Sequence, residues 1–151
     1  MQWNVSDLVV DRKSKFQARC CVLKDQADIP DILSQMIQSD KHISKASHMH
    51  MYAWRTAVVS HSQSNSSGKK KNKKNSSPEV EVTVKNVQQG SSDCGEAGAG
   101  QRLLTLLERV NVFNVLVIVT RWYGGTPLGS ARFRHISSAA LQSLRIGGFV
   151  P

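Results

Sequence analysis

The stretch of residues 121–125 holds the residue types best suited to binding an anion or a base. It reads Arg121, Trp122, Tyr123, Gly124 and Gly125, and it lies between a predicted strand and the last predicted helix. Backbone N–H groups at a glycine turn before a helix favour negative charge. Arg121 is suited to pairing with a phosphate or carboxylate, and Trp122 or Tyr123 to stacking on a base. The alternative is structural, because aromatic residues at a strand end usually pack and glycines usually form turns.

A second glycine-rich stretch carries acidic side chains, with Asp93 and Glu96 on either side of Cys94 and Gly95. Carboxylates just before a helix cap its free N–H groups and complement its dipole, and this is the interpretation that we favour. The same two residues could instead hold a cation or form a salt bridge with a partner. Two carboxylates are too few to define a metal site without further ligands.

Catalytic and metal-binding patterns are otherwise missing from the sequence. His48 and His50 would share one face of a strand, but a zinc site needs a third ligand. There is no nucleophile elbow of the Gly-x-Ser-x-Gly type and no Gly-x-x-x-x-Gly-Lys-Ser/Thr phosphate loop. We therefore expect a protein that is not an enzyme and holds no metal or other cofactor. Phosphate chemistry through Asp93, Glu96 and Arg121 is the remaining catalytic alternative.

The charge of the chain is concentrated in one segment. The formal net charge is +9, and five of these charges come from the run Lys69, Lys70, Lys71, Lys73 and Lys74. The rest of the chain is only modestly basic, so the charge alone does not indicate nucleic-acid binding, although the run would attract polyanions in a salt-sensitive way. Three cysteines do not form a disulfide framework and favour reduced thiols in the cytoplasm. We expect no membrane span and no signal peptide.

Hydrophobic periodicity predicts the elements that must position these groups. The five apolar residues 115–119 predict a buried central strand, and strict alternation at residues 80–85 predicts a half-buried one. Apolar residues at steps of three and four predict a helix at residues 29–37, with Asp28 as its cap. In chain order, strands are predicted at residues 5–10, 16–22, 48–59, 80–85 and 115–119, and helices at residues 29–37, 103–110 and 133–144.

This order predicts an α/β domain of the α+β two-layer type. We expect a mixed sheet of four to five strands with the helices packed mainly on one face. Residues 60–78 are rich in Ser, Asn and Lys and lack large apolar side chains, which predicts a disordered internal loop. The 151 residues are then one domain, because too little chain lies on either side of the loop for two cores.

Four ordered motifs are spread over most of the chain. The first is residues 10–16, which include Arg12, Lys13 and Lys15, and the second is residues 46–55, from Ala46 through His48 to Arg55. The third is the acidic loop at residues 93–96. The fourth is residues 121–125, followed by Leu128, Gly129, Arg132 and Phe133. Together these motifs give the chain a specific resemblance to the Impact family of translation regulators.

The resemblance implies a fold like the second domain of ribosomal protein S5. It also implies a role in translation control, in which family members bind the activator of a stress kinase and so restrain phosphorylation of an initiation factor. Ribosomes and actin are further partners that the family implies. From its length, we expect the chain to lack the separate partner-binding domain of the eukaryotic regulators and the ferredoxin-like domain of the bacterial members.

We therefore expect a binding module of translation regulation that acts in the cytoplasm, with nuclear entry left open by the lysine run. Direct binding of RNA or of the ribosome is the main alternative. The residues expected to contact a partner or nucleic acid are Arg12, Lys13, Lys15, His48, Arg55, Asp93, Glu96, Arg121, Trp122, Tyr123, Gly124, Gly125 and Arg132. This contact surface can form only if the early basic turn, the acidic loop and the late aromatic turn meet in space.

Overall fold

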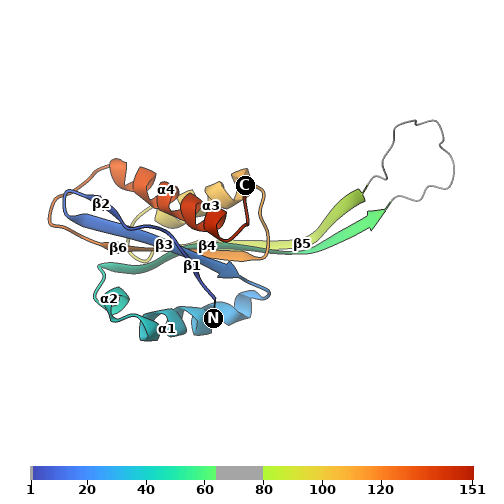
Figure 1. The fold of residues 1–151 in the computed structure, drawn as a ribbon, viewed down its shortest axis with the longest axis horizontal. Coiled ribbons are helices and arrows are strands. Elements are labelled where there is room, and N and C mark those ends of the chain that lie inside the picture. The colour runs from blue at the N-terminus through green and yellow to red at the C-terminus, as the bar shows by residue number, and fades with distance from the viewer. Residues whose placement is uncertain (1, 64–79) are drawn as a thin grey trace. The chain divides into compact units, whose positions relative to one another are not determined.

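The computed structural model describes residues 2–63 and 80–151 (Figure 1). It divides into two compact units, one made of residues 1–56 and 88–151 and the other of residues 57–87. The first unit contains all the helices and both clusters of buried apolar side chains. Within the described residues, no helix is long and apolar enough to cross a membrane.

A six-stranded sheet forms the centre of the fold, as the α+β class predicts. The strands are β1 (Asn4–Val5), β2 (Val9–Asp11), β3 (Ser14–Val22), β4 (His48–Gln63), β5 (Val80–Ser92) and β6 (Val115–Trp122). Their order is β1-β3-β6-β4-β5, and β2 also pairs with β3. The pairs of β3 with β1, β2 and β6, and of β4 with β6, are antiparallel. The sheet thus has one strand more than expected, because the apolar run at residues 5–10 forms two short strands.

The central strand β6 is buried on both faces. Val115, Val117 and Val119 belong to one buried cluster, while Leu116 and Ile118 belong to the other. Such a strand can be apolar throughout because each face of the sheet is covered by protein. The prediction of a buried central strand at residues 115–119 is confirmed.

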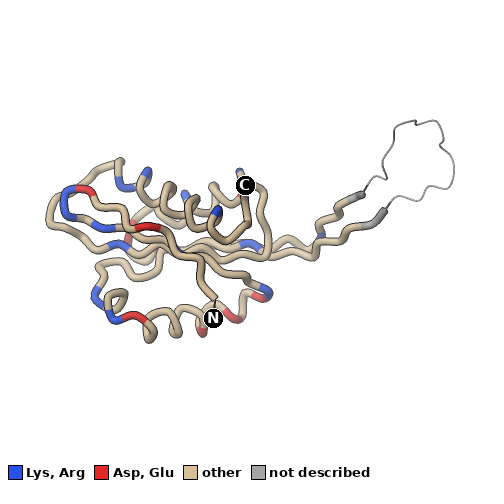
Figure 2. Tube along the Cα trace, in the orientation of Figure 1, with Lys and Arg blue, Asp and Glu red and all other residues tan. Residues whose placement is uncertain are grey.

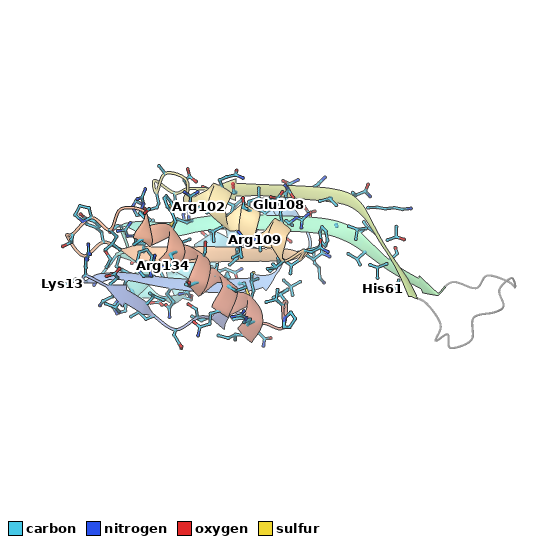
Figure 3. All side chains as sticks on the ribbon, turned by 90° about the horizontal axis from the view of Figure 1, so that it is seen from above. Lys13, His61, Arg102, Glu108, Arg109 and Arg134 are labelled. Atoms are coloured by element: carbon cyan, nitrogen blue, oxygen red, sulfur yellow. The ribbon has the colours of Figure 1, made fainter. Side chains whose placement is uncertain are left out.

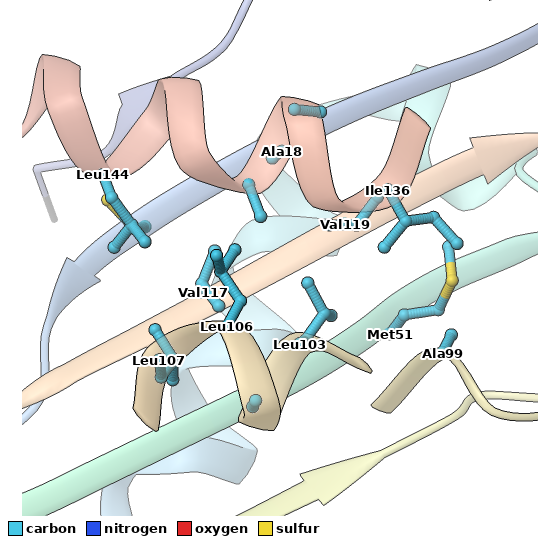
Figure 4. Close-up of a cluster of buried hydrophobic side chains, with 14 of the residues drawn as sticks. Ala18, Met51, Ala99, Leu103, Leu106, Leu107, Val117, Val119, Ile136 and Leu144 are labelled. Carbon is cyan, nitrogen blue, oxygen red and sulfur yellow. The ribbon is translucent and has the colours of Figure 1, made fainter. Parts of the chain in front are cut away.

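Helices cover both faces of the sheet, which corrects the expectation that they lie mainly on one face. Helices α3 (Ala99–Arg109) and α4 (Ala131–Ile146) pack on one face, and α1 (Ile29–Ser39) and α2 (Lys41–Ser44) on the other (Figure 1). The cluster below α3 and α4 includes Leu103, Leu107, Ile136 and Leu144 (Figure 4). The apolar stripes of all three long helices were read correctly, but a stripe does not say which face of the sheet it meets.

A β-bulge changes the faces of β4. The pairing of β4 with β6 shifts register between His48 and Met51. Met51 packs in the cluster under α3 and α4, whereas Met49 packs with Tyr52 and Trp54 against the other cluster. A regular strand would place Met49 and Met51 on the same face. The alternation of a regular strand therefore fails at the start of β4, because an extra residue at a bulge inverts the faces beyond it.

Local capping also differs from the sequence prediction. Asp28 precedes α1, but its side chain makes no capping hydrogen bond. The carboxylate of Asp25 instead accepts a hydrogen bond of 3.0 Å from the N–H of Ala27, at the start of a short 3-10 helix (Gln26–Asp28). The chain thus enters α1 through an extra helical turn that the sequence pattern did not indicate.

The unit of residues 57–87 contains parts of β4 and β5, and none of its described residues belongs to either buried cluster. Val82 and Val84 are 57% and 37% exposed, so the strand predicted there exists but is not half-buried. Strand β4 runs to Gln63, so residues 60–63 are not part of a loop. Residues 64–78 of the predicted loop, with the lysine run, lie outside the described residues.

Burial explains the state of two of the three cysteines. Burial raises the pKa of the Cys20 thiol to about 11 and that of the Cys21 thiol to about 12. The two cysteines are adjacent in the sequence and point to opposite faces of β3, because Cys20 lies in the cluster under α3 and α4 and Cys21 lies in the other cluster. Both are therefore protonated, structural thiols at neutral pH.

Candidate functional site

The carboxylate of Glu96 is the centre of a buried ion cluster, which consists of Glu96, Arg121, Arg132 and His48. Nη1 of Arg121 donates to both oxygens of Glu96, at 2.8 and 2.9 Å. Nε of Arg132 lies 2.8 Å from Oε2 of Glu96, and Nε2 of His48 lies 3.4 Å from Oε1. Glu96 and Arg121 are only 6% and 4% exposed. One carboxylate thus joins the acidic loop to β4, β6 and α4.

The acidic loop has a geometry that turns Glu96 inward. Asp93 accepts hydrogen bonds from the N–H groups of Gly98 and Gly100, at 3.2 and 2.7 Å, and so caps the start of α3 as predicted. The backbone N–H of Glu96 donates to the carbonyl of Asp93 at 2.9 Å. The carbonyl of Cys94 accepts a hydrogen bond of 2.9 Å from Nδ1 of His48. These bonds fix the loop against β4 and leave Glu96 pointing at Arg121.

The turn between β2 and β3 packs directly against the glycine turn after β6. The N–H of Gly124 donates to Oγ of Ser14 at 3.0 Å. A Cβ atom at Gly124 would lie 2.2 Å from the carbonyl carbon of Lys13, so only glycine fits this approach. Asp11, on the other side of the turn, lies 2.7 Å from Nε2 of His135 in α4. The turn is therefore anchored to both β6 and α4.

The aromatic residues at the end of β6 have different surroundings. Nε1 of Trp122 donates to the carbonyl of His42 at 2.8 Å, which ties β6 to α2. The Tyr123 side chain is 48% exposed, and the guanidinium carbon of Arg121 lies 5.4 Å from the centre of its ring. The same guanidinium lies 5.1 Å from the ring of Phe16. Arg121 thus supports Tyr123 from inside the protein, and Tyr123 is the aromatic residue that faces solvent.

The three segments expected to converge do meet at one end of the sheet. Lys15 and Trp122 are cross-strand partners in the pairing of β3 with β6, and Lys13 contacts Gly124. The exposed charged and aromatic side chains at this place are Arg12, Lys13, Lys15 and Tyr123, and we call them the basic end. Figure 2 shows the cluster of Lys and Arg positions at the β2–β3 turn.

Other predicted site residues lie elsewhere or inside the protein. Arg55 pairs with Val115 at the opposite end of β6, donates to Gln89 at 3.0 Å and stacks on Phe113. Arg121 and Glu96 face one another rather than solvent. The positions that sequence reasoning missed are Ser14, His42 and His135, which accept or donate the bonds that fix the turns. Ser14 lies in a recognised motif, but nothing in the sequence pairs His42 with Trp122 or His135 with Asp11.

The carboxylates of Asp93 and Glu96 do not face a common site. Asp93 accepts from the backbone at the start of α3, and Glu96 is held by Arg121 and Arg132. In the described part of the chain, no group of three or more His, Cys, Asp or Glu side chains could hold a metal ion. The arrangement that phosphate chemistry through these residues would require is not formed.

Backbone strain gathers at the same end of the sheet. Six residues other than glycine have positive φ among the described residues, and three of them are asparagines, which tolerate this conformation. The other three are Arg12, Lys13 and Cys94, with φ of 49°, 71° and 47°. Strained backbone conformations are concentrated at functional sites in proteins. The strained residues thus lie in the β2–β3 turn of the basic end and in the acidic loop.

Comparison with known proteins gives a consistent result. The family model of the Impact N-terminal domain matches residues 12–144. The chain is 62% identical over 159 residues to "IMPACT family member YDL177C" of Saccharomyces cerevisiae, covering 99% of this chain and 94% of that protein. It is 32% identical to "Protein IMPACT homolog" of the same yeast and 36% identical to "Protein IMPACT" of Oryctolagus cuniculus. These matches cover 97% and 87% of this chain, but only 47% and 34% of those relatives.

Two solved structures resemble the fold. The two-domain translational regulator Yih1 has a TM-score of 0.54 and 31% identity, and the match covers 95% of this chain and 46% of that one. A hypothetical protein has a TM-score of 0.62 at 20% identity, over 96% of this chain and 61% of that one, which supports the fold alone. Because the family model matches residues 12–144 and the 62% identical yeast relative is covered over 94% of its length, the protein belongs to the Impact family.

Proposed function

We propose that this protein is a binding module of translation regulation that docks a protein partner on the basic end. The observation that carries the proposal is the buried pair of Glu96 and Arg121, which holds the acidic loop, β6 and α4 together behind that surface. A surface fixed before binding loses less conformational entropy when the partner docks. A structural relative supports a role in translation regulation, since Yih1 is described as a translational regulator.

The chemistry of the basic end favours an acidic protein surface as the partner. Arg12, Lys13 and Lys15 are exposed cations, while the nearby carboxylate of Asp11 is already paired with His135. Tyr123 adds an exposed aromatic ring, and Tyr and Arg are enriched among the residues that contribute most to protein interfaces. The activator of the stress kinase is the partner that the family resemblance suggests, with the ribosome and actin as further candidates. We place this activity in the cytoplasm.

Direct binding of RNA through residues 121–123 has less support. Arg121 is buried against Glu96, and the indole N–H of Trp122 is used by the carbonyl of His42. Only Tyr123 of the three presents an open side chain for stacking on a base. A catalytic role has less support again, because Asp93 and Glu96 are held by donors of the protein itself.

Purification of the tagged full-length protein from its own cells after crosslinking tests the proposal. The chain and a variant with Lys13→Glu and Lys15→Glu are compared, each with and without nuclease treatment. A control with Lys24→Glu and Lys41→Glu makes the same change in charge at exposed lysines elsewhere. We expect translation factors to be enriched with the unchanged chain and with the control, and to be lost with the variant. Nuclease treatment should not reduce their recovery. Recovery of no translation factor, or equal recovery by all three, contradicts the proposal.

A further inference from the structure

A second basic surface lies on α3 and α4, and its charged side chains are not members of the ion cluster. Between the two helices is a hollow of about 190 Å³, lined by Gln101, Arg102, Thr105, Arg109 and Ser137. Every one of these side chains can donate a hydrogen bond, and none is a carboxylate. The hollow therefore suits an anionic group, such as a phosphate.

The charges around the hollow are strongly one-sided. Helices α3 and α4 carry five arginines and one acidic residue, Glu108, whose carboxylate accepts a hydrogen bond of 2.9 Å from Gln89. Within residues 2–63 and 80–151, none of Arg102, Arg109 and Arg134 pairs with a carboxylate. Figure 2 shows basic positions along these helices, whereas positions of both signs occur around α1 and α2 on the other face. The field of this face is thus positive and uncompensated.

The arginines form a row rather than a single point. Arg102 and Arg109 are seven residues apart on α3, which is two helical turns and about 10 Å along the axis. Figure 3 shows them with Arg134 on the neighbouring helix α4. The guanidinium carbon of Arg102 lies 3.9 Å from the centre of the Phe133 ring, so this side chain is held in place before any ligand binds. A row of this length can contact more than one phosphate of a polymer.

The composition of the surface favours nucleic acid over a protein partner. Among the described large apolar residues that are exposed, Ile146 is the one contributed by α3 or α4. Protein interfaces depend on buried apolar and aromatic anchors, whereas nucleic-acid interfaces are more polar and more positive. Ser, Thr and Gln beside arginine are the usual donors to phosphate and sugar oxygens.

The same surface favours helical RNA over a single strand. Single strands bind on exposed aromatic rings that stack on bases. The aromatic ring on this face, that of Phe133, is covered by the guanidinium groups of Arg102 and Arg132, at 3.9 and 4.2 Å. Double-helical RNA is recognised through its shape, its phosphates and its 2′-hydroxyl groups, which need donors and charge but no stacking.

We propose that the outer face of α3 and α4 binds the sugar–phosphate backbone of double-helical RNA, independently of base sequence. Arg109 and Arg134 contact phosphates, Arg102 is the fixed charge beside the hollow, and Gln101, Thr105 and Ser137 donate to phosphate or 2′-hydroxyl oxygens. This surface is separate from the basic end, so the proposal does not depend on the identity of the protein partner.

Fluorescence anisotropy with a labelled RNA duplex of about 20 base pairs tests the proposal, because a duplex of this length spans a typical double-stranded RNA site. The variant is Arg109→Gln with Arg134→Gln, and the control is Lys24→Gln with Lys41→Gln, which removes the same charge from exposed positions outside α3 and α4. We expect the variant to bind about tenfold more weakly at physiological salt and its salt slope to fall by about two, as for two lost phosphate contacts. The control should change affinity by less than about twofold.

Two comparisons separate this proposal from a general attraction between opposite charges. The variant and control are repeated in a chain in which the lysines at positions 69, 70, 71, 73 and 74 are replaced by glutamine, so that this run does not contribute to binding. A single-stranded RNA of equal length and a poly-glutamate peptide are the competitor probes. Equal loss in variant and control, no measurable duplex binding, or equal affinity for either competitor overturns the proposal. Unchanged circular dichroism of both variants verifies that each is folded.

Discussion

At the scale of single residues, Glu96 explains why three distant motifs act as one structure. A carboxylate taken out of water is stable only when it is paired and hydrogen-bonded. Glu96 meets this requirement with Arg121 and Arg132 and lies beside His48. Its partners come from β6, α4 and β4, so the placement of each element depends on the same side chain. Glu96 and Arg121 therefore support the binding surface rather than form its outer layer.

Removing the charge of Glu96 should destabilise the fold. In the Glu96→Gln variant, Arg121 stays buried without a counter-charge, and we expect a loss of about 3 kcal/mol in the free energy of unfolding. Urea denaturation measures this loss. Glu108→Gln is the matched control, because its carboxylate is exposed and bonds only to Gln89 among the described residues. The control should lose less than about 0.5 kcal/mol. A similar small loss in Glu96→Gln would show that the ion cluster does not hold the motifs together.

The strained turn at Arg12 and Lys13 should show a trade-off between stability and binding. Left-handed backbone costs ordinary residues about 1–2 kcal/mol each, whereas Asn-Gly is the sequence preferred in a two-residue hairpin turn with positive φ. Arg12→Asn with Lys13→Gly should therefore raise stability by about 1–2 kcal/mol and Tm by several degrees. The same variant should recover less of the crosslinked partner. Thermal unfolding and the purification described above measure the two effects. A variant that is no more stable would mean that the turn is not strained, and one that binds normally would mean that its side chains are not needed.

At the scale of elements, close backbone contact aligns the β2–β3 turn with the end of β6. Gly124 has no Cβ to keep Lys13 away, and its N–H bonds to Ser14. This contact joins the β2–β3 hairpin turn to the glycine turn between β6 and α4, which is far away in the sequence. The two glycines of the motif therefore have different roles. Gly124 allows the close backbone contact with Lys13, whereas Gly125 adopts a positive φ.

The two neighbouring glycines should respond differently to alanine. Gly124→Ala places a Cβ against the backbone of Lys13, and we expect a loss of at least about 2 kcal/mol, because backbone cannot move aside as a side chain can. Gly125→Ala meets nothing within 4 Å and should lose only about 1 kcal/mol, the cost of its φ of +95°. Urea denaturation compares the two, and hydrogen exchange at the β2–β3 turn shows where the effect lies. Equal losses would mean that the contact between the turns is not tight.

The elements that could be predicted are those formed by interactions between residues close together in the sequence. Helices α1, α3 and α4 and strand β6 were found because their apolar periodicity is local. The bulge between His48 and Met51 was missed because it depends on the register of β4 against β6, and no local residue pattern encodes it. The pairing of Glu96 with Arg121 was missed for the same reason, since 25 residues separate them. The motifs indicated which residues belong to the site, but only the fold shows that Arg55 lies at the far end of β6.

At the scale of the whole molecule, the two units have different contributions to stability. No described residue of the 57–87 unit belongs to either buried cluster, and its exposed side chains include Val58, Val82 and Val87. Among the described residues, the buried apolar side chains of both clusters therefore lie in the unit of residues 1–56 and 88–151, and burial of such side chains is the main favourable term in folding. The same unit holds the ion cluster, the basic end and the arginine row of α3 and α4.

Shortening the smaller unit should leave the larger one folded. We expect replacement of residues 60–85 by a short Gly-Ser linker to change the free energy of unfolding by less than about 1 kcal/mol. None of the described residues in this segment belongs to a buried apolar cluster, and the cost of closing a loop depends weakly on its length. Chemical denaturation of the shortened and full chains gives this difference. A loss of cooperative unfolding in the shortened chain would show that all 151 residues form one folding unit.

The most direct test of the account is site-specific photocrosslinking in cells. Tyr123 is replaced by a photoreactive benzoylphenylalanine in one chain and Val22 in another, since both side chains are exposed but Val22 lies at the opposite end of β3, paired with Val115. Docking of the partner on the basic end predicts a covalent adduct with a translation factor from position 123, lost when Lys13 and Lys15 are changed to Glu, and no such adduct from position 22. An adduct from position 22 alone, or the same adduct from both positions, would contradict the claim that the partner docks on the basic end.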